Sequence, residues 1–174
     1  MLRFVYAFPL TWIVILTAAV AAIWGYLQTV VPDRWWRILN LLVAFSSIAA
    51  ILYVVVFSRN PGQYLVMLRP FATLDAAKLQ PELYRELLMN AFLFFPLGLT
   101  LSNVLPQKWS RWGRIALTTL CGCLLSVGIE YAQYRFSLGM AETDDVLCNT
   151  LGAFLGACSL LIAYGVKRVQ KKTK

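Results

Sequence analysis

The chain has 174 residues, of which 60% are hydrophobic and 14% charged, with a formal net charge of +8. About a quarter of the residues of an ordinary soluble domain are charged, so this composition excludes that class of protein. Apolar blocks of about 20 residues, each long enough to cross a hydrocarbon core of about 30 Å, fill most of the chain. We therefore expect an all-α fold, a single bundle of about five transmembrane helices over residues 1–174.

The first two apolar blocks cover about residues 8–27 and 38–57. The first block is long enough to span a bilayer and has no small-residue cleavage site after it, so we interpret it as a retained helix. A polar connection with an interfacial pair, Trp35 and Trp36, joins the two blocks. The mixed segment 63–85 that follows is too polar to span, and its prolines favour short helical turns and loop at the membrane interface.

The remaining three blocks cover about residues 86–105, 114–134 and 145–166. Pro96 and Gly98 in the third block predict a kink, which could open a cavity or serve packing alone. Gly152 and Gly156 in the fifth block form a small-xxx-small pattern, which is most often a helix-packing feature. After the fifth block we expect a frayed basic tail over residues 167–174.

Positive residues lie at the ends of the apolar blocks, which is typical of cations that fix membrane topology rather than bind nucleic acid. The connection after the third block contains Lys108, Arg111 and Arg114, and the tail contains Lys167, Arg168, Lys171, Lys172 and Lys174. The positive-inside rule then predicts a cytoplasmic C-terminus, with segment 63–85 and the connection before the fifth block outside. Segment 63–85 opposes this topology, because its own cations favour the inside. We expect the basic tail to attract anionic lipid.

The four cysteines lie in apolar segments, and the chain contains no histidine, the commonest protein ligand of zinc and haem. We interpret the cysteines as small apolar residues of the membrane interior and expect neither a metal site nor a cofactor.

Ionisable and amide side chains recur in the last three blocks, where they are costly unless they face the bundle interior. They are Glu86 and Asn90, then Ser126, Glu130 and Gln133, and finally Asp145 and Asn149. Within each block their spacing places them on one helical face. The predicted topology brings them, with Arg59, to the outer third of the bundle. We therefore predict a ligand-binding site that consists of Arg59, Glu86, Asn90, Glu130, Gln133, Asp145 and Asn149.

A purely structural role is the alternative interpretation of these residues. Asp145 could be the N-cap of the fifth helix, and Glu130 could form an ion pair with Arg59 or Arg135 that fixes helix register. The amides of the set could form interhelical hydrogen bonds. The sequence leaves both interpretations open.

Four motifs in series resemble those of the VanZ-like family. They are Arg59 with Leu68-Arg69-Pro70-Phe71; Asn90 with Phe94-Phe95-Pro96-Leu97-Gly98; Ser126, Ile129-Glu130 and Gln133; and Asp144-Asp145 with Asn149-Thr150-Leu151-Gly152. The resemblance covers about residues 59–156. Family members often carry an arginine shortly before the aspartate pair, whereas the nearest cation of this chain, Arg135, is offset.

The resemblance implies a small multi-pass protein of the bacterial cytoplasmic membrane, in a family named for a member linked to teicoplanin resistance. Our leading hypothesis is a protein that binds a lipid headgroup or lipid-linked cell-wall component and modulates glycopeptide susceptibility. Arg59 would bind the anionic group in a bidentate fork, and Glu130 would hold Arg59 or the ligand in place.

Two other functions are weighed beside this hypothesis. An intramembrane enzyme could act on a lipid-linked substrate through Glu130 and Asp145, although no histidine, reactive serine motif or nucleotide loop supports it. A proton pathway through Glu130 would need polar residues further along the fourth block. Segment 117–125 offers only Thr118 and Thr119, so such a path would stop there.

Overall fold

The structure is a computed structural model that describes residues 10–54, 66–80 and 82–172. Its helices are α2 (Leu10–Val30), α3 (Asp33–Leu52), α4 (Ala72–Ala77), α5 (Glu82–Val104), α6 (Arg111–Phe136), α7 (Thr143–Ala157) and α8 (Ser159–Lys172). Within these described residues, five helical stretches are long and apolar enough to cross a membrane, with α7 and α8 together forming the fifth. The predicted all-α transmembrane bundle is thus confirmed.

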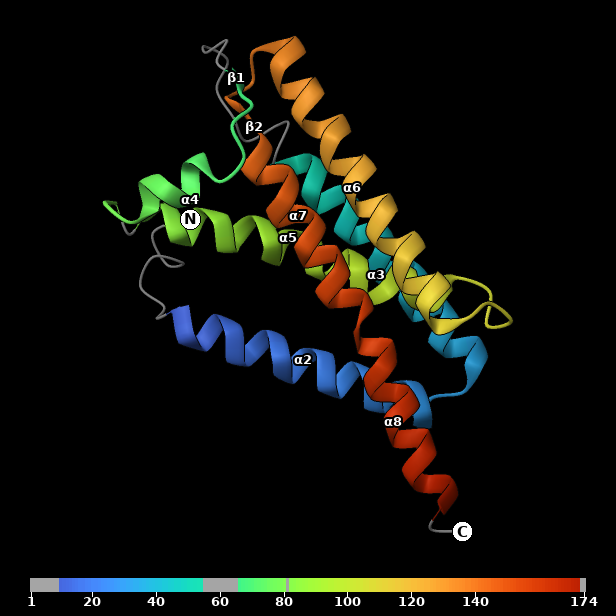
Figure 1. Ribbon diagram of the computed structural model, residues 1–174. Coiled ribbons are helices and arrows are strands. Elements are labelled where there is room, and N and C mark those ends of the chain that lie inside the picture. Colours follow the sequence, from blue (N-terminus) through green and yellow to red (C-terminus); the bar gives the residue numbers. More distant parts are fainter. Residues whose placement is uncertain (1–9, 55–65, 81, 173–174) are drawn as a thin grey trace.

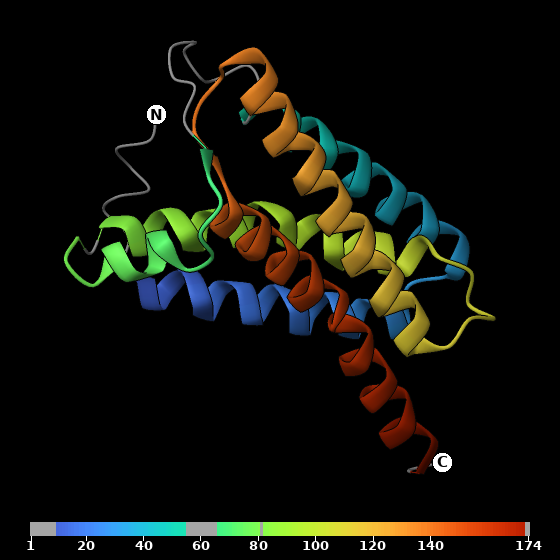
Figure 2. The ribbon, with the colours of Figure 1, turned by 45° about the horizontal axis from the view of Figure 1, so that its top comes forward.

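Helix α7 is the central element of the bundle. It packs against α5 along most of its length and against α6 on another side, while α3 covers α5 and α2 contacts α8. Figures 1 and 2 show α8 continuing beyond the other helices at the end where α2 turns into α3. The buried apolar core lies where α3, α5, α6 and α7 meet and contains Ile51, Phe94, Leu97, Ile129 and Ala153.

Small residues allow α5 and α7 to touch backbone to backbone. A Cβ atom added to Gly98, Gly152 or Gly156 would fall on a main-chain carbonyl of the opposing helix. These carbonyls belong to Ala153, Ala91 and Phe95, respectively. The two fifth-block glycines therefore have the packing role that their spacing favours. Pro96 lies inside α5, and the kink expected there stays a prediction.

The tryptophan pair near the start of α3 differs from the expectation. Trp35 is 65% exposed, but Trp36 is only 3% exposed and is therefore not interfacial. Its ring packs against Trp24 of α2 at a centroid distance of 5.1 Å. Trp24 Nε1 donates a hydrogen bond to Asn40 Oδ1 at 3.2 Å, so a partly buried polar contact also joins α2 to α3.

The predicted fifth helix is divided. Helix α7 ends at Ala157, Cys158 forms a turn, and α8 begins at Ser159. The basic residues up to Lys172 belong to α8, so the expectation of a frayed tail is wrong for them. Leu160 and Ala163 are buried against the bundle, whereas Lys167, Arg168 and Lys171 are exposed. This explains how the segment folds as an amphipathic helix.

The two ends of the bundle differ in character. The strand end contains α4, the starts of α5 and α7, the end of α6 and a two-residue parallel pair between β1 (Val66–Met67) and β2 (Ala141–Glu142). The short helix α4 agrees with the turns expected in segment 63–85, whereas the strand pair was not expected. The basic end contains the α2–α3 and α5–α6 connections together with α8.

Candidate functional site

Polar side chains from α5, α6 and α7 gather at the strand end. Asn90 of α5 donates a hydrogen bond from Nδ2 to Oδ1 of Asp145 at 2.6 Å, which joins α5 to α7. Helix α7 begins at Thr143 with Glu142 at its N-cap, so Asp145 is the third residue of the helix. The interpretation of Asp145 as an N-cap is therefore wrong, because its carboxylate binds across to the neighbouring helix.

A second amide contact joins α7 to α6 one turn further along. Asn149 Nδ2 donates to Ser126 Oγ at 2.9 Å, and both side chains are buried. This bond and the Asn90–Asp145 bond are interhelical hydrogen bonds, as the structural interpretation expects. The two bonds connect Asn90, Asp145, Asn149 and Ser126. Glu130 and Gln133 share the helical face of Ser126 on α6 and are also buried. We call these six residues the polar cluster (Ser126, Glu130, Gln133, Asn90, Asp145 and Asn149).

Glu130 connects α6 to the loop before α7. Its Oε2 accepts a hydrogen bond from the main-chain N–H of Glu142 at 2.9 Å. The Glu142 carboxylate in turn accepts the hydroxyl hydrogen of Thr73 at 2.6 Å, which continues the contact to α4. Arg135 lies exposed at the end of α6, with its guanidinium carbon 6.0 Å from the centre of the Phe136 ring.

Two buried amides of the polar cluster have unused hydrogen-bonding capacity. Gln133 is 1% exposed and Asn149 is 4% exposed. Neither Gln133 Oε1 nor Asn149 Oδ1 has a hydrogen-bond partner among the described residues. The great majority of buried polar atoms in native structures are hydrogen-bonded, and each exception calls for an explanation such as a functional role or an ordered water or ion. Both atoms can accept hydrogen bonds from a donor group.

Two predicted site residues lie apart from these contacts. Glu86 is exposed on α5, one turn before Asn90, and no hydrogen bond or ion pair joins it to another described residue. Arg59 lies outside the described residues, so its role as an anion-binding group stays a prediction. Among the described residues, no three cysteine or carboxylate side chains come together in a way that could hold a metal ion.

Asp144 is a site residue that the prediction did not include. Its side chain is buried, and Oδ1 accepts the N–H of Phe71 at 2.5 Å. Oδ2 accepts the N–H groups of Thr73 at 2.8 Å and Leu74 at 3.3 Å. One carboxylate of α7 thus binds the otherwise unbonded amides at the start of α4. Consecutive helical residues point about 100° apart, so Asp144 faces α4 while Asp145 faces α5.

An apolar cavity of about 360 Å³ lies beside Asp144, between α4, α5 and α7. It is lined by Phe71, Leu74, Tyr84, Leu87, Leu88, Ala91, Asp144, Leu147, Cys148 and Leu151. The lining includes the immediate neighbours of Asn90 and Asp145 in the chain. Polar side chains and an apolar cavity therefore occur at the same level of α5 and α7.

Comparison with known proteins identifies the family. Residues 42–164 match the VanZ/LLP1 family, and this range contains every residue of the polar cluster. The chain belongs to the VanZ/LLP1 family. It is also 34% identical over 73 residues to Protein VanZ of Enterococcus faecium, a match that covers 42% of each chain. The chain therefore spans less than half of this relative. No solved structure gives a significant match.

Proposed function

We propose that this VanZ-like membrane protein binds a lipid headgroup or a lipid-linked cell-wall component at the strand end and thereby modulates susceptibility to teicoplanin. The observation that supports the proposal best is the pair of buried acceptors, Gln133 Oε1 and Asn149 Oδ1, without a partner among the described residues. Both lie in the part of the chain that matches the family.

The chemistry of an amphiphilic ligand fits this end of the bundle. Hydroxyl or amine hydrogens of a headgroup can donate to the two carbonyl oxygens, which a purely apolar chain cannot do. Arg59 supplies the anion-binding group in this proposal, because a guanidinium can hold phosphate in a bidentate fork. The apolar cavity between α4, α5 and α7 is of a size that can take part of a hydrocarbon chain.

The proposed topology gives such a ligand access to the strand end from outside the cell. If the basic end is cytoplasmic, as the positive-inside rule predicts, the strand end faces the outside of the cytoplasmic membrane. Lipid-linked cell-wall precursors present their headgroups on that side, where glycopeptides also act. The similar protein of Enterococcus faecium is named Protein VanZ. The link between this chain and teicoplanin is our proposal.

Gln133→Met separates a ligand role from a structural one. The exchange conserves the length of the side chain and removes a buried carbonyl that has no described partner, so we expect little loss of stability. We expect cells that express the wild-type chain to tolerate more teicoplanin than cells with an empty vector. Cells with the Gln133→Met chain should lose that tolerance while keeping the same amount of protein in their membranes.

Arg59→Ala extends the test to the proposed anion-binding group, and Gln63→Ala, in the same connection, is its matched control. Equal tolerance of the wild-type and Gln133→Met cells at equal protein level would contradict a ligand role for the buried acceptors. A wild-type chain that leaves teicoplanin tolerance unchanged would contradict the proposed biological role.

A further inference from the structure

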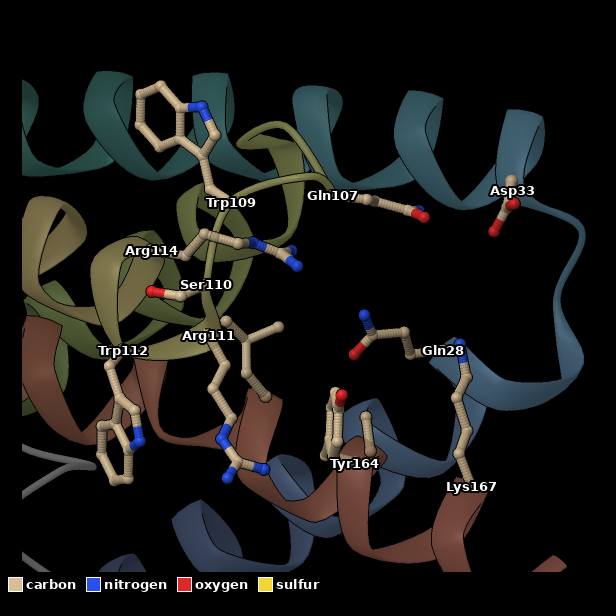
Figure 3. A pocket seen from close by; sticks show the side chains of 12 residues that line it. Gln28, Asp33, Gln107, Trp109, Ser110, Arg111, Trp112, Arg114, Tyr164 and Lys167 are labelled. Carbon is tan, nitrogen blue, oxygen red and sulfur yellow. The ribbon is translucent and has the colours of Figure 1, made fainter. Parts of the chain in front are cut away.

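A second cavity lies at the basic end, on the far side of the bundle from the polar cluster. Its volume is about 430 Å³, and α2, α3, the α5–α6 connection, α6 and α8 contribute to its lining. Figure 3 shows Gln28, Gln107, Arg111, Arg114, Tyr164 and Lys167 surrounding one shared space. This cavity contains none of the residues to which the proposed function is assigned.

The lining of this cavity is rich in positive charge. Three cations line it, namely Arg111, Arg114 and Lys167, together with a single carboxylate, that of Asp33. Neither Arg111, Arg114 nor Lys167 forms an ion pair with a carboxylate among the described residues. Three like charges held in one cavity with a single carboxylate leave an excess of positive charge, so binding of an anion is favoured there.

Arg114 shows that the cavity is built into the fold. From its place in the sequence it is interpreted as one of the cations that fix membrane topology, and it is only 8% exposed. Its Nε and Nη2 both donate to the main-chain carbonyl of Ser102, at 2.9 and 2.7 Å. A guanidinium has five N–H donors, and these two hydrogen bonds to one carbonyl oxygen use two of them. The remaining donors lie at the wall of the cavity, in a fixed orientation.

Arg111 and the start of α6 form the neighbouring wall. The Arg111 guanidinium carbon lies 4.7 Å from the centre of the Tyr164 ring, so this contact joins α6 to α8. Stacking on a ring leaves the N–H edge of the guanidinium available for an anion. Ser110 is the N-cap of α6, and the positive end of the helix dipole adds to the field of the three cations.

We propose that this cavity binds the phosphate of an anionic phospholipid headgroup. The volume and the donor set fit a phosphodiester with a small polar substituent, for which Gln28 and Gln107 supply hydrogen bonds. Trp109 and Trp112 line the cavity and are 44% and 58% exposed. Exposed tryptophans at the ends of spanning helices lie at the level of lipid headgroups, which favours a lipid over a soluble phosphate.

The test is a titration of the full-length protein in detergent with phosphatidylglycerol, followed by native mass spectrometry, with phosphatidylcholine as the neutral comparison. We expect one phosphatidylglycerol to bind more tightly than any phosphatidylcholine. Arg111→Gln with Lys167→Gln should weaken that binding by roughly fivefold for each cation removed. Lys167→Gln alone keeps the Arg111–Tyr164 contact. This single variant replaces the double variant in the titration if the double variant does not fold.

Arg168→Gln with Lys171→Gln is the matched control, because it removes the same charge from exposed positions of α8 outside the cavity. It should leave the tight binding within about twofold of wild type, since the lost charges act only at long range. An equal loss in both double variants, or no loss in either, would overturn the proposal. Displacement of the lipid by millimolar glycerol 1-phosphate would overturn its assignment to a lipid.

Discussion

Asn90 and Asp145 are joined by a 2.6 Å hydrogen bond that crosses from α5 to α7 at the strand end of the bundle. Hydrogen bonds between membrane helices contribute about 0.6 kcal/mol on average and up to about 1.7 kcal/mol. A double-mutant cycle of Asn90→Ala and Asp145→Ala should therefore give a coupling energy of about 1 kcal/mol in unfolding of the purified protein. Additive effects of the two changes would show that the bond is not formed.

Asp144→Asn should release helix α4 from the bundle. The neutral amide accepts hydrogen bonds more weakly than a carboxylate and can bond fewer of the three amides at once. We expect faster amide hydrogen exchange of Thr73 and Leu74, with exchange in α5 and α7 unchanged. Asp75→Asn is the control, because Asp75 is an exposed residue of the same helix whose ion pairs, among the described residues, are with Arg69 and Lys78. Amide hydrogen exchange of Thr73 and Leu74 in the Asp75→Asn variant should match that of wild type.

Gly152→Ala should destabilise the packing of α5 against α7. The added methyl group meets the main-chain carbonyl of Ala91, which cannot move away as a side chain can. We expect a loss of about 1–3 kcal/mol in the free energy of unfolding. Gly128→Ala in α6 is the control, since a Cβ there has open space around it. It should be neutral or stabilising by about 0.5–1 kcal/mol, and equal effects of both changes would contradict the described crossing.

The predicted topology can be measured with reporter fusions. Alkaline phosphatase fused after Lys174 should be inactive, because it needs the oxidising outside, whereas green fluorescent protein at the same place should fluoresce. The reporters should behave in the opposite way when inserted after Leu79, which is 88% exposed in the connection between α4 and α5. Active phosphatase at the C-terminus would place the polar cluster on the cytoplasmic side and remove the access that the proposed function requires.

The helices could be predicted because each spanning segment needs a long apolar block, and this requirement is visible in composition alone. The common face of Ser126 and Glu130 also followed from helical spacing. The structure adds that Asn149 bonds with Ser126 and that Asn90 bonds with Asp145. Which residue of one helix meets which residue of another depends on crossing angles that spacing does not give.

Three features could not be derived from the sequence for related reasons. Burial of Arg114 depends on the carbonyl of Ser102, a main-chain group that every residue has. The different directions of Asp144 and Asp145 depend on where α4 and α5 lie around α7. The turn at Cys158 has no proline beside it, and the nearby Gly156 is already accounted for by helix packing. Each of these features depends on tertiary packing, which the local pattern of residues in the sequence does not determine.

The central claim is that the polar cluster holds a headgroup, and an experimental structure of the protein in nanodiscs made from its native membrane lipids tests it most directly. The account predicts headgroup density within hydrogen-bonding distance of Gln133 Oε1 and Asn149 Oδ1, with an apolar chain extending from it along the bundle. Ordered water alone at both atoms, or a protein side chain bonded to each of them, would contradict the claim.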